Sequence, residues 1–169
     1  AIDMVRDSDV DAVIIDLRGN PGGIGGLAMG VGGHFLEEPT NLGTMHNTFG
    51  ELNFNTNPQV VSPSGELVDP LSVPLVVIVD SMSASTSEIF AGGMQEAQRA
   101  AIAGRRTPGL ALPAVAEKLP NGDILYHAIA EFELPSGQTI EGVGVSPDLP
   151  VALEQGSFSK SSDPDIRAA

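Results

Sequence analysis

The amino-acid sequence predicts an α/β fold, in which buried strands alternate with helices. Residues 10–19 and 72–80 are continuous apolar runs, as is typical of buried parallel strands. Each run is followed by a turn rich in small residues and then by a segment with helical spacing. A chain of 169 residues suits one domain with its own core. We expect a single domain over residues 1–169, with functional side chains at the carboxyl ends of its strands.

The first half of the chain is expected to form a strand, a turn and a helix before a polar segment. Residues 10–19 predict the first strand, and "NPGGIGG" at 20–26 is a glycine-rich turn. Residues 27–38 have helical spacing, which three glycines weaken. Residues 41–70 are polar with some alternation, so they predict a loop with short strands and a hairpin around "SPSGE".

The second half of the chain continues the alternation. Residues 72–80 predict the second buried strand, 86–99 a helix and 100–106 a third strand. Residues 124–137 hold two short strands, and residues 138–156 end the domain.

Both ends of the sequence look cut. Residues 1–9 are typical of the tail of an amphipathic helix without a start signal. Near the other end, Ser162 or Asp163 is a cap candidate, and Pro164 stands at a first-turn position of a helix that barely begins. We therefore expect a piece of a longer protein, truncated at both ends, from which an upstream targeting segment could have been lost.

Composition excludes several function classes. The chain has 8 Lys and Arg against 22 Asp and Glu, a net charge of −14, which would repel nucleic acid and anionic membranes. It has no cysteine, which excludes disulfides, thiol catalysis and Cys-ligated zinc. Since no apolar run reaches ~18 residues, no membrane span is expected.

The stretch "SMSASTSE" at 81–88 crowds hydroxyls where a strand passes to a helix. Ser85 and Glu88 fit a capping box, in which the serine caps the helix and the glutamate reaches back. The same position would also expose a serine nucleophile beside the positive end of the helix dipole. The turn does not fit G-x-S-x-G, because Ser83 and Ser87 occupy the glycine positions. The motif alone therefore leaves both a cap and a nucleophile open.

The glycine-rich stretch "RGNPGGIGG" at 18–26 also has two interpretations. It could be a tight connection, or it could present backbone N–H groups to an anion. A nucleotide cradle is disfavoured, because no glycine is followed by lysine and Ala28 breaks the G-x-G-x-x-G pattern. An oxyanion hole is the remaining functional option, pairing one of these amides with the amide of Thr86.

A general base is not evident in the sequence. His34 falls on the predicted helix, His46 in the polar loop and His127 in a predicted strand, where packing or solvated roles are the simplest interpretation. The two lysines, Lys118 and Lys160, stand in a Pro-flanked loop and a serine-rich tail. Because no histidines form a ligand pair, we expect no metal site, and we expect no cofactor.

Three motifs together resemble the S41 peptidases, the family of carboxyl-terminal processing proteases and tricorn-like proteases. They are "DLRGNPGG" (16–23), "SASTSEIFAGGMQEAQRAAIAGRRTPG" (83–109) and "PSGQTIEGVGVSPDLPV" (135–151). The resemblance implies a ClpP/crotonase-like spiral of ββα units and a serine endopeptidase that acts on polypeptides. It also implies an upstream strand and helix outside this piece, and in many relatives a PDZ domain precedes this region. A location in the cell envelope or outside the cell is a further expectation of the family, and the sequence leaves the oligomeric state open.

The resemblance also assigns residues. Ser85 matches the nucleophile, while Gly22 or Gly23 and Thr86 match the oxyanion hole. Ser85 can be nucleophile and helix cap at once. Leu110 stands where the carboxyl-terminal processing branch has its lysine, and a leucine cannot take a proton.

The tricorn-like branch offers another source of the base. It uses a histidine that lies upstream of the D-L-R strand and a glutamate near the end of the domain. Glu141 looks like that glutamate. The resemblance therefore implies a base supplied from outside the piece, and the piece alone is expected to be inactive or nearly so.

Two alternatives come from other classes of protein. The first is a non-catalytic S41-like domain that binds peptides or ligands or scaffolds an assembly, and Leu110 favours it. The second is a crotonase-like acyl-CoA enzyme, which the serine turn argues against.

Overall fold

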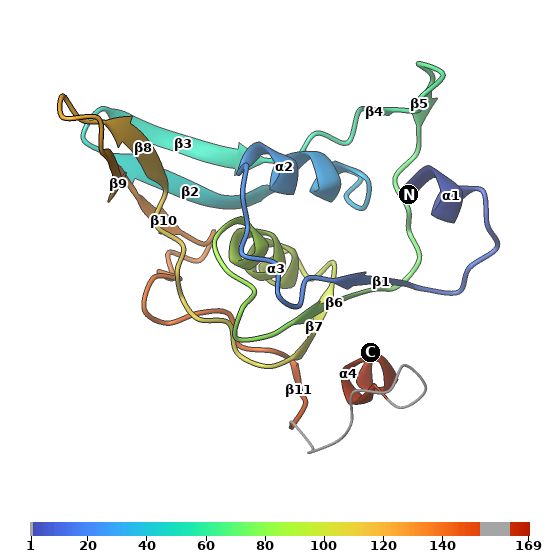
Figure 1. Ribbon diagram of the computed structural model, residues 1–169. Helices are drawn as coiled ribbons and strands as arrows, with labels where there is room; N and C mark the ends of the chain where they lie inside the picture. The colour runs from blue at the N-terminus through green and yellow to red at the C-terminus, as the bar shows by residue number, and fades with distance from the viewer. Residues whose placement is uncertain (1, 153–162) are drawn as a thin grey trace.

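Four parallel strands form the sheet that carries the two predicted turns, in the computed structural model of residues 2–152 and 163–169 (Figure 1). Their spatial order is β1 (Val13–Asp16), β6 (Leu75–Val79), β7 (Ala101–Gly104) and β11 (Leu149–Pro150). The register pairs Asp16 with Ile78, and Val79 with Gly104. The carboxyl ends of β1, β6 and β7 therefore lie at one edge of the sheet, where α/β folds build their sites.

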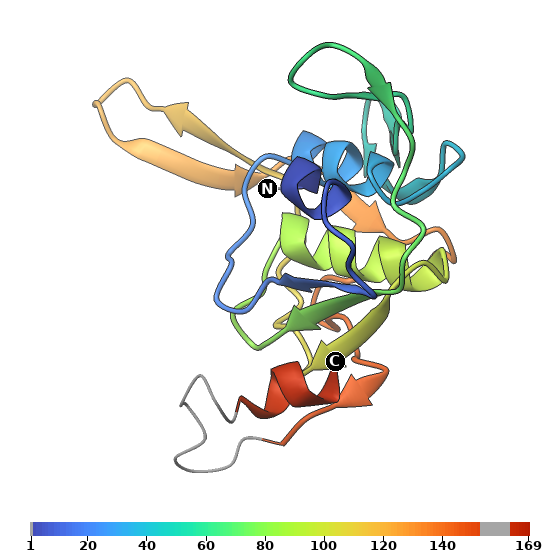
Figure 2. The same ribbon diagram turned by 90° about the vertical axis from the view of Figure 1, so that its right-hand side faces the viewer.

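One helix packs on the parallel sheet, and a second layer covers the other side of that helix. This helix is α3 (Thr86–Glu96), and Figures 1 and 2 show it between the parallel sheet and the second layer. The second layer consists of α2 (Gly26–Gly33) and an antiparallel sheet ordered β10 (Glu131–Glu133), β2 (Asn41–Asn47) and β3 (Gly50–Asn55). A Cβ on Gly93 of α3 would lie 2.6 Å from the Leu42 side chain, so glycine is needed for this close approach.

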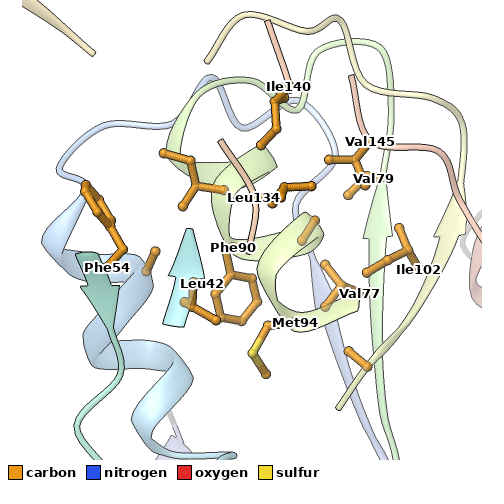
Figure 3. Packing of buried hydrophobic residues seen from close by; sticks show 14 of the residues in the cluster. Leu42, Phe54, Val77, Val79, Phe90, Met94, Ile102, Leu134, Ile140 and Val145 are labelled. Atoms are coloured by element: carbon orange, nitrogen blue, oxygen red, sulfur yellow. The ribbon is translucent and has the colours of Figure 1, made fainter. Parts of the chain in front are cut away.

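The hydrophobic core lies on both sides of α3 (Figure 3). Leu42, Val77, Met94 and Ile102 have no exposed surface. Phe132 meets Phe54 edge to face, with ring centroids 5.3 Å apart. This core fixes α3 against β6, and with it the turn between them. The fully buried side chains of highest volume are those of Phe132, Leu42, Ile78, Met94, Ile102 and Ile140.

Two hairpins extend from these layers. One joins β4 (Val60–Val61) to β5 (Leu67–Val68) and contains the predicted "SPSGE" turn. The other joins β8 (Ala114–Lys118) to β9 (Ile124–Ala128), and Figure 2 shows it as a ribbon that projects away from the rest of the chain.

Short helices form near the two ends of the described chain. They are α1 (Ile2–Arg6) and α4 (Pro164–Ala168). Asp163 caps α4 by accepting hydrogen bonds from the amides of Asp165 and Ile166, so it is the cap of the two candidates; Ser162 lies outside the described residues. Figure 2 shows α4 on the face of the parallel sheet opposite α3.

The predicted order of buried strands and helix is confirmed, since β1, β6, α3 and β7 lie within the expected segments. The helix predicted over 27–38 is too long, because α2 ends at Gly33 and the His34 amide already turns back to Val31 O. The polar segment contains the predicted short strands and hairpin, but less loop than expected. Its strands β2 and β3 span seven and six residues and pair with one register shift between Asn41 and Thr44, and Leu42 and Phe54 anchor them in the core although most of their neighbours are polar. Lys118 ends a strand and does not lie in a loop.

Candidate active site

Ser85 stands on a strained turn between β6 and α3. Its backbone has φ +56° and ψ −121°, and among the described residues only Gln98 shares a positive φ without being glycine. Such a conformation costs about 1–3 kcal/mol and persists only where its surroundings fix it. The Ser85 amide donates to Leu110 O at 3.0 Å and to Glu88 Oε2 at 3.1 Å. Two neighbours thus hold the half-buried serine at the edge of the sheet.

Ser85 and Glu88 have the arrangement of a capping box at the start of α3, although among the described residues no strict hydrogen bond joins the helix to the Ser85 hydroxyl. Ser85 is the N-cap residue of α3, and Glu88 occupies the third helical position, as the capping box predicts. The Glu88 amide lies near the Ser85 side chain but donates to the Ser85 carbonyl oxygen, at 2.8 Å. Within the described chain, the hydroxyl makes no cap hydrogen bond to α3.

The other hydroxyls of the serine turn (residues 81–88) form hydrogen bonds with the glycine-rich loop that follows β1. Ser83 Oγ donates to Leu17 O at 2.8 Å, and Thr86 Oγ1 donates to Gly23 O at 3.0 Å. Ser87 Oγ donates to Asn20 O at 3.1 Å. These bonds join segments more than sixty residues apart in sequence. They explain the crowding of hydroxyls in "SMSASTSE" as a connection between two turns.

Gly22 is packed directly against the Ser85 turn. A Cβ at Gly22 would lie 2.7 Å from Ser85 Cβ and 2.6 Å from Ala84 O, and its φ of +89° also favours glycine. The Gly22 amide donates to Asn20 Oδ1 at 2.9 Å. The amides of Gly23 and Thr86 have no hydrogen-bond partner among the described residues. Of the two glycines predicted for an oxyanion hole, Gly23 therefore has the available donor.

Asp80 links the serine turn to the glycine-rich loop by hydrogen bonds. Its carboxylate accepts from the Gly19 amide at 3.0 Å, the Met82 amide at 2.9 Å and Ser83 Oγ at 3.2 Å. Burial raises the pKa of Asp80, but these donors and the charge of Arg105 outweigh it and hold the pKa below its usual value. The sequence signal was a carboxylate directly after a buried strand, and sequence reasoning missed it.

Glu88 has a wider role than the capping box. Its fully buried carboxylate accepts from Thr107 Oγ1 at 2.5 Å and from the amides of Gly109 and Leu110, both at 2.8 Å. With the bond from Ser85, four donors meet one side chain. Glu88 thus fixes the turn at 107–110 against the start of α3.

Leu110 lies beside the serine but offers no proton acceptor on its side chain. Its carbonyl oxygen accepts from the Ser85 amide, and its side chain is 59% exposed. The position that the sequence comparison marked for lysine is therefore adjacent to Ser85 in space and apolar in this chain.

Glu141 and the three histidines do not contact Ser85. Glu141 Oε2 accepts from the amides of Ala111 at 2.8 Å and Leu112 at 3.2 Å, so it fixes the segment after Leu110. None of the described hydrogen bonds or ion pairs joins a histidine to Ser85 or Glu141. The histidine contacts are His34 with Arg6, His46 with Glu51 and Glu133, and His127 with Glu117 and Ala128.

An apolar pocket of about 280 Å³ opens beside the glycine-rich loop. Gly22, Gly23 and Thr86 form one side of it. The remaining wall is mainly apolar, from Ile15, Leu17, Ile24, Leu27, Val31 and Phe90. The pocket therefore suits an uncharged, apolar group placed next to the two available amides.

The described part of the chain contains no cluster of three or more side chains suited to a metal ion. Within the same residues, every helix is too short or too polar to cross a membrane.

Comparison with known proteins identifies a family whose members are similar to this chain. The family model "Peptidase family S41" matches residues 1–151. The carboxyl-terminal-processing protease of Synechocystis sp. is 30% identical over 164 residues, covering 97% of this chain and 36% of that protein. The carboxy-terminal-processing protease of Bartonella bacilliformis is 34% identical over 138 residues, covering 82% and 30%. The chain thus spans about a third of the length of these relatives.

Solved structures of related proteins have the same fold. The photosystem II D1 C-terminal processing protease superimposes with a TM-score of 0.75 at 25% identity, over 100% of this chain and 42% of the other. The tricorn protease superimposes with a TM-score of 0.66 at 18% identity, over 93% and 14%, which supports the fold alone.

Proposed function

The chain belongs to peptidase family S41, and on that premise we propose that it is the catalytic core of a serine endopeptidase with Ser85 as nucleophile. One observation carries the proposal. A strained serine at the start of a helix lies against Gly22, beside the amides of Gly23 and Thr86, which have no partner among the described residues. Amide pairs of this kind stabilise the oxyanion of acyl transfer.

The proposed reaction uses these groups in sequence. A base takes the Ser85 proton as Ser85 Oγ attacks the carbonyl carbon of a peptide bond. The amides of Gly23 and Thr86 donate to the tetrahedral oxyanion, and the positive end of α3 adds to their effect. The base then gives its proton to the departing amine, which leaves an acyl ester on Ser85 that water hydrolyses. The apolar pocket beside Gly22 would hold a substrate side chain next to the scissile bond.

The base comes, in this proposal, from residues outside this chain. Leu110 cannot accept a proton, and the described histidines contact other groups. Glu141 takes a supporting role, because it holds the amides of Ala111 and Leu112 directly after Leu110. A histidine that approached from that side would find both Ser85 and a carboxylate near it, as in Ser–His–acid sites.

We also infer the wider setting of the core. The succession of β-strands and helices around the parallel sheet is consistent with a spiral of ββα units. Polypeptide substrates follow from the proposed chemistry. The location in the cell envelope or outside the cell stays a prediction.

A non-catalytic binding domain is the second candidate, and Leu110 favours it. In this case the apolar pocket would bind a peptide side chain without cleavage.

Active-site labelling separates the two candidates. The full-length protein is treated with a fluorophosphonate, which reacts with activated serines, and the labelled peptide is identified by mass spectrometry. We expect the label on Ser85 and its loss in Ser85→Ala. Ser81→Ala is the matched control, because Ser81 lies exposed in the same turn. An unlabelled full-length protein would contradict the peptidase and favour the binding domain.

A further inference from the structure

We propose that Asp165 is a positioning residue for the glycine loop (residues 19–23), which it holds in place through Arg18. The inference rests on the proposed function, since it concerns the loop that carries the Gly23 amide. Asp165 belongs to α4, beyond the residues that the family model matches.

Asp165 is a buried carboxylate that binds two arginines. Its side chain is 3% exposed. Asp165 Oδ2 accepts from Arg18 Nη1 at 3.0 Å, and both carboxylate oxygens accept from Arg105, at 2.9 and 3.1 Å. Paired geometry of this kind gives directional as well as electrostatic stabilisation. A carboxylate placed here therefore sets the orientation of both guanidinium groups.

Arg18 transmits this constraint to the glycine loop. It follows β1 and directly precedes Gly19, the first residue of the loop. Its guanidinium also binds Asp16, at 2.6 Å, and Asp163, at 2.7 Å. Three carboxylates thus bind one side chain, two of them from the α4 segment. Because Arg18 binds two carboxylates of the α4 segment, and Figure 2 shows α4 on the face of the sheet opposite α3, the loop begins from a fixed point.

Arg105 is the second arginine that Asp165 binds. It follows β7, and its amide donates to Val79 O at 3.0 Å. The positive charge of Arg105 helps to lower the pKa of Asp80. Asp80 in turn accepts from the Gly19 amide. Arg18 therefore acts on Gly19 directly through the chain, and the charge of Arg105 makes a minor favourable contribution at Asp80.

Loss of the Asp165 carboxylate should loosen the loop without unfolding it. Arg18 would keep Asp16 and Asp163, while Arg105 would lose the one carboxylate that it binds among the described residues. The hydroxyls of Ser83, Thr86 and Ser87 would still clasp the loop. We expect the Gly23 amide to sample more positions, which weakens the oxyanion interaction more than it weakens binding in the apolar pocket.

Hydrogen exchange and active-site labelling test the role of Asp165 in the full-length protein. Asp165→Asn should raise amide exchange in residues 17–24 about tenfold while the core peptides keep their protection. It should also slow fluorophosphonate labelling of Ser85 about tenfold or more. Asp165→Glu keeps the charge and should recover part of both effects.

Asp148→Asn is the matched control. Asp148 also binds a side chain and a backbone amide beside the parallel sheet, namely Gln95 and the Ile102 amide, but none of its described hydrogen bonds involves Arg18, Arg105 or the glycine loop. It should lower global stability and leave exchange in residues 17–24 unchanged relative to the core. Equal effects of Asp165→Asn and Asp148→Asn on this segment would overturn the inference. Selective exchange at 17–24 in a protein whose serine never labels would support the role of Asp165 and refute the peptidase.

Discussion

The serine turn and the glycine loop at the sheet edge are held by one kind of contact, and the β8–β9 ribbon is held by another. The serine turn and the glycine loop are joined by hydroxyl-to-carbonyl bonds and by Asp80, and each bond crosses from one chain segment to another. The ribbon is held mainly by its own strand ladder, and its residues are mostly exposed. The strained backbone of Ser85 lies within the cross-linked turns. The comparison teaches that polar cross-links between distant segments, more than burial alone, keep the site in shape.

The largest effect should come from filling the space between the two clasped turns. Gly22→Ala places a Cβ 2.6–2.8 Å from three atoms of the serine turn and forces alanine into φ +89°. We expect a loss of about 4 kcal/mol in unfolding free energy, the sum of strain and overpacking. Urea denaturation followed by circular dichroism measures it, since the chain has no tryptophan.

Gly65→Ala is the control for this substitution. Gly65 has φ +86°, but a Cβ there would meet nothing within 4 Å. It should cost about 1 kcal/mol, from the backbone conformation alone. Similar losses for the two variants would show that the contact between the turns is not tight.

Glu88→Gln removes the charge that binds four donors at the start of α3. The amide of glutamine presents N–H groups where donors already point, so we expect a loss of about 3 kcal/mol. Glu117→Gln, on the exposed ribbon, provides the comparison, because the Glu117 side chain is 65% exposed. It should change stability by less than about 0.5 kcal/mol. Thermal unfolding of both variants at one pH checks the difference, and equal shifts would contradict the central role of Glu88.

Low pH should weaken the link between the serine turn and the glycine loop, because it protonates Asp80. Its folded pKa lies below the ordinary value, which is about 3.9 in an unfolded chain. Its contribution is therefore present above that value and is lost as the pH falls through the folded pKa. Asp80→Asn should cost about 2 kcal/mol near neutral pH, from its charged hydrogen bonds, and progressively less below about pH 4. A stability difference that stays constant down to pH 2 would refute this assignment.

The smallest effect is expected on the ribbon. Tyr126→Ala removes a side chain that is 76% exposed, so unfolding free energy should change by less than about 0.5 kcal/mol. Fluorophosphonate labelling of Ser85 should keep its rate in this variant. A marked loss of labelling would show that the ribbon contributes to the site and would remove the contrast drawn above.

The sequence was sufficient for the elements whose signals are local. The apolar runs predicted β1, β6 and β7, and the S-x-x-E pattern predicted where α3 begins. The glycine and serine turns could be brought together because the carboxyl ends of parallel strands share an edge. The roles predicted for Ser85, Glu141 and the oxyanion residues remain predictions that labelling can test.

The missed features depend on partners that are distant in sequence. Glu88 was interpreted as a local cap because its donors at 107–110 come from another segment. Strands β2 and β3 were underestimated because they bury few side chains among many polar ones. Asp165 lies in a polar tail without periodicity, and only the fold brings it to Arg18. A single sequence contains no signal for such pairs.

The hydrogen bonds between the serine turn and the glycine loop have a consequence for the newly synthesised protein. The serine turn and the glycine loop lie more than sixty residues apart in sequence, and they meet at the ends of the paired strands β1 and β6. The partners of Glu88 are synthesised later still, at residues 107–110. Closing such long loops is slow compared with forming a single helix. The serine turn and the glycine loop can therefore take their final arrangement only when nearly the whole core has been synthesised.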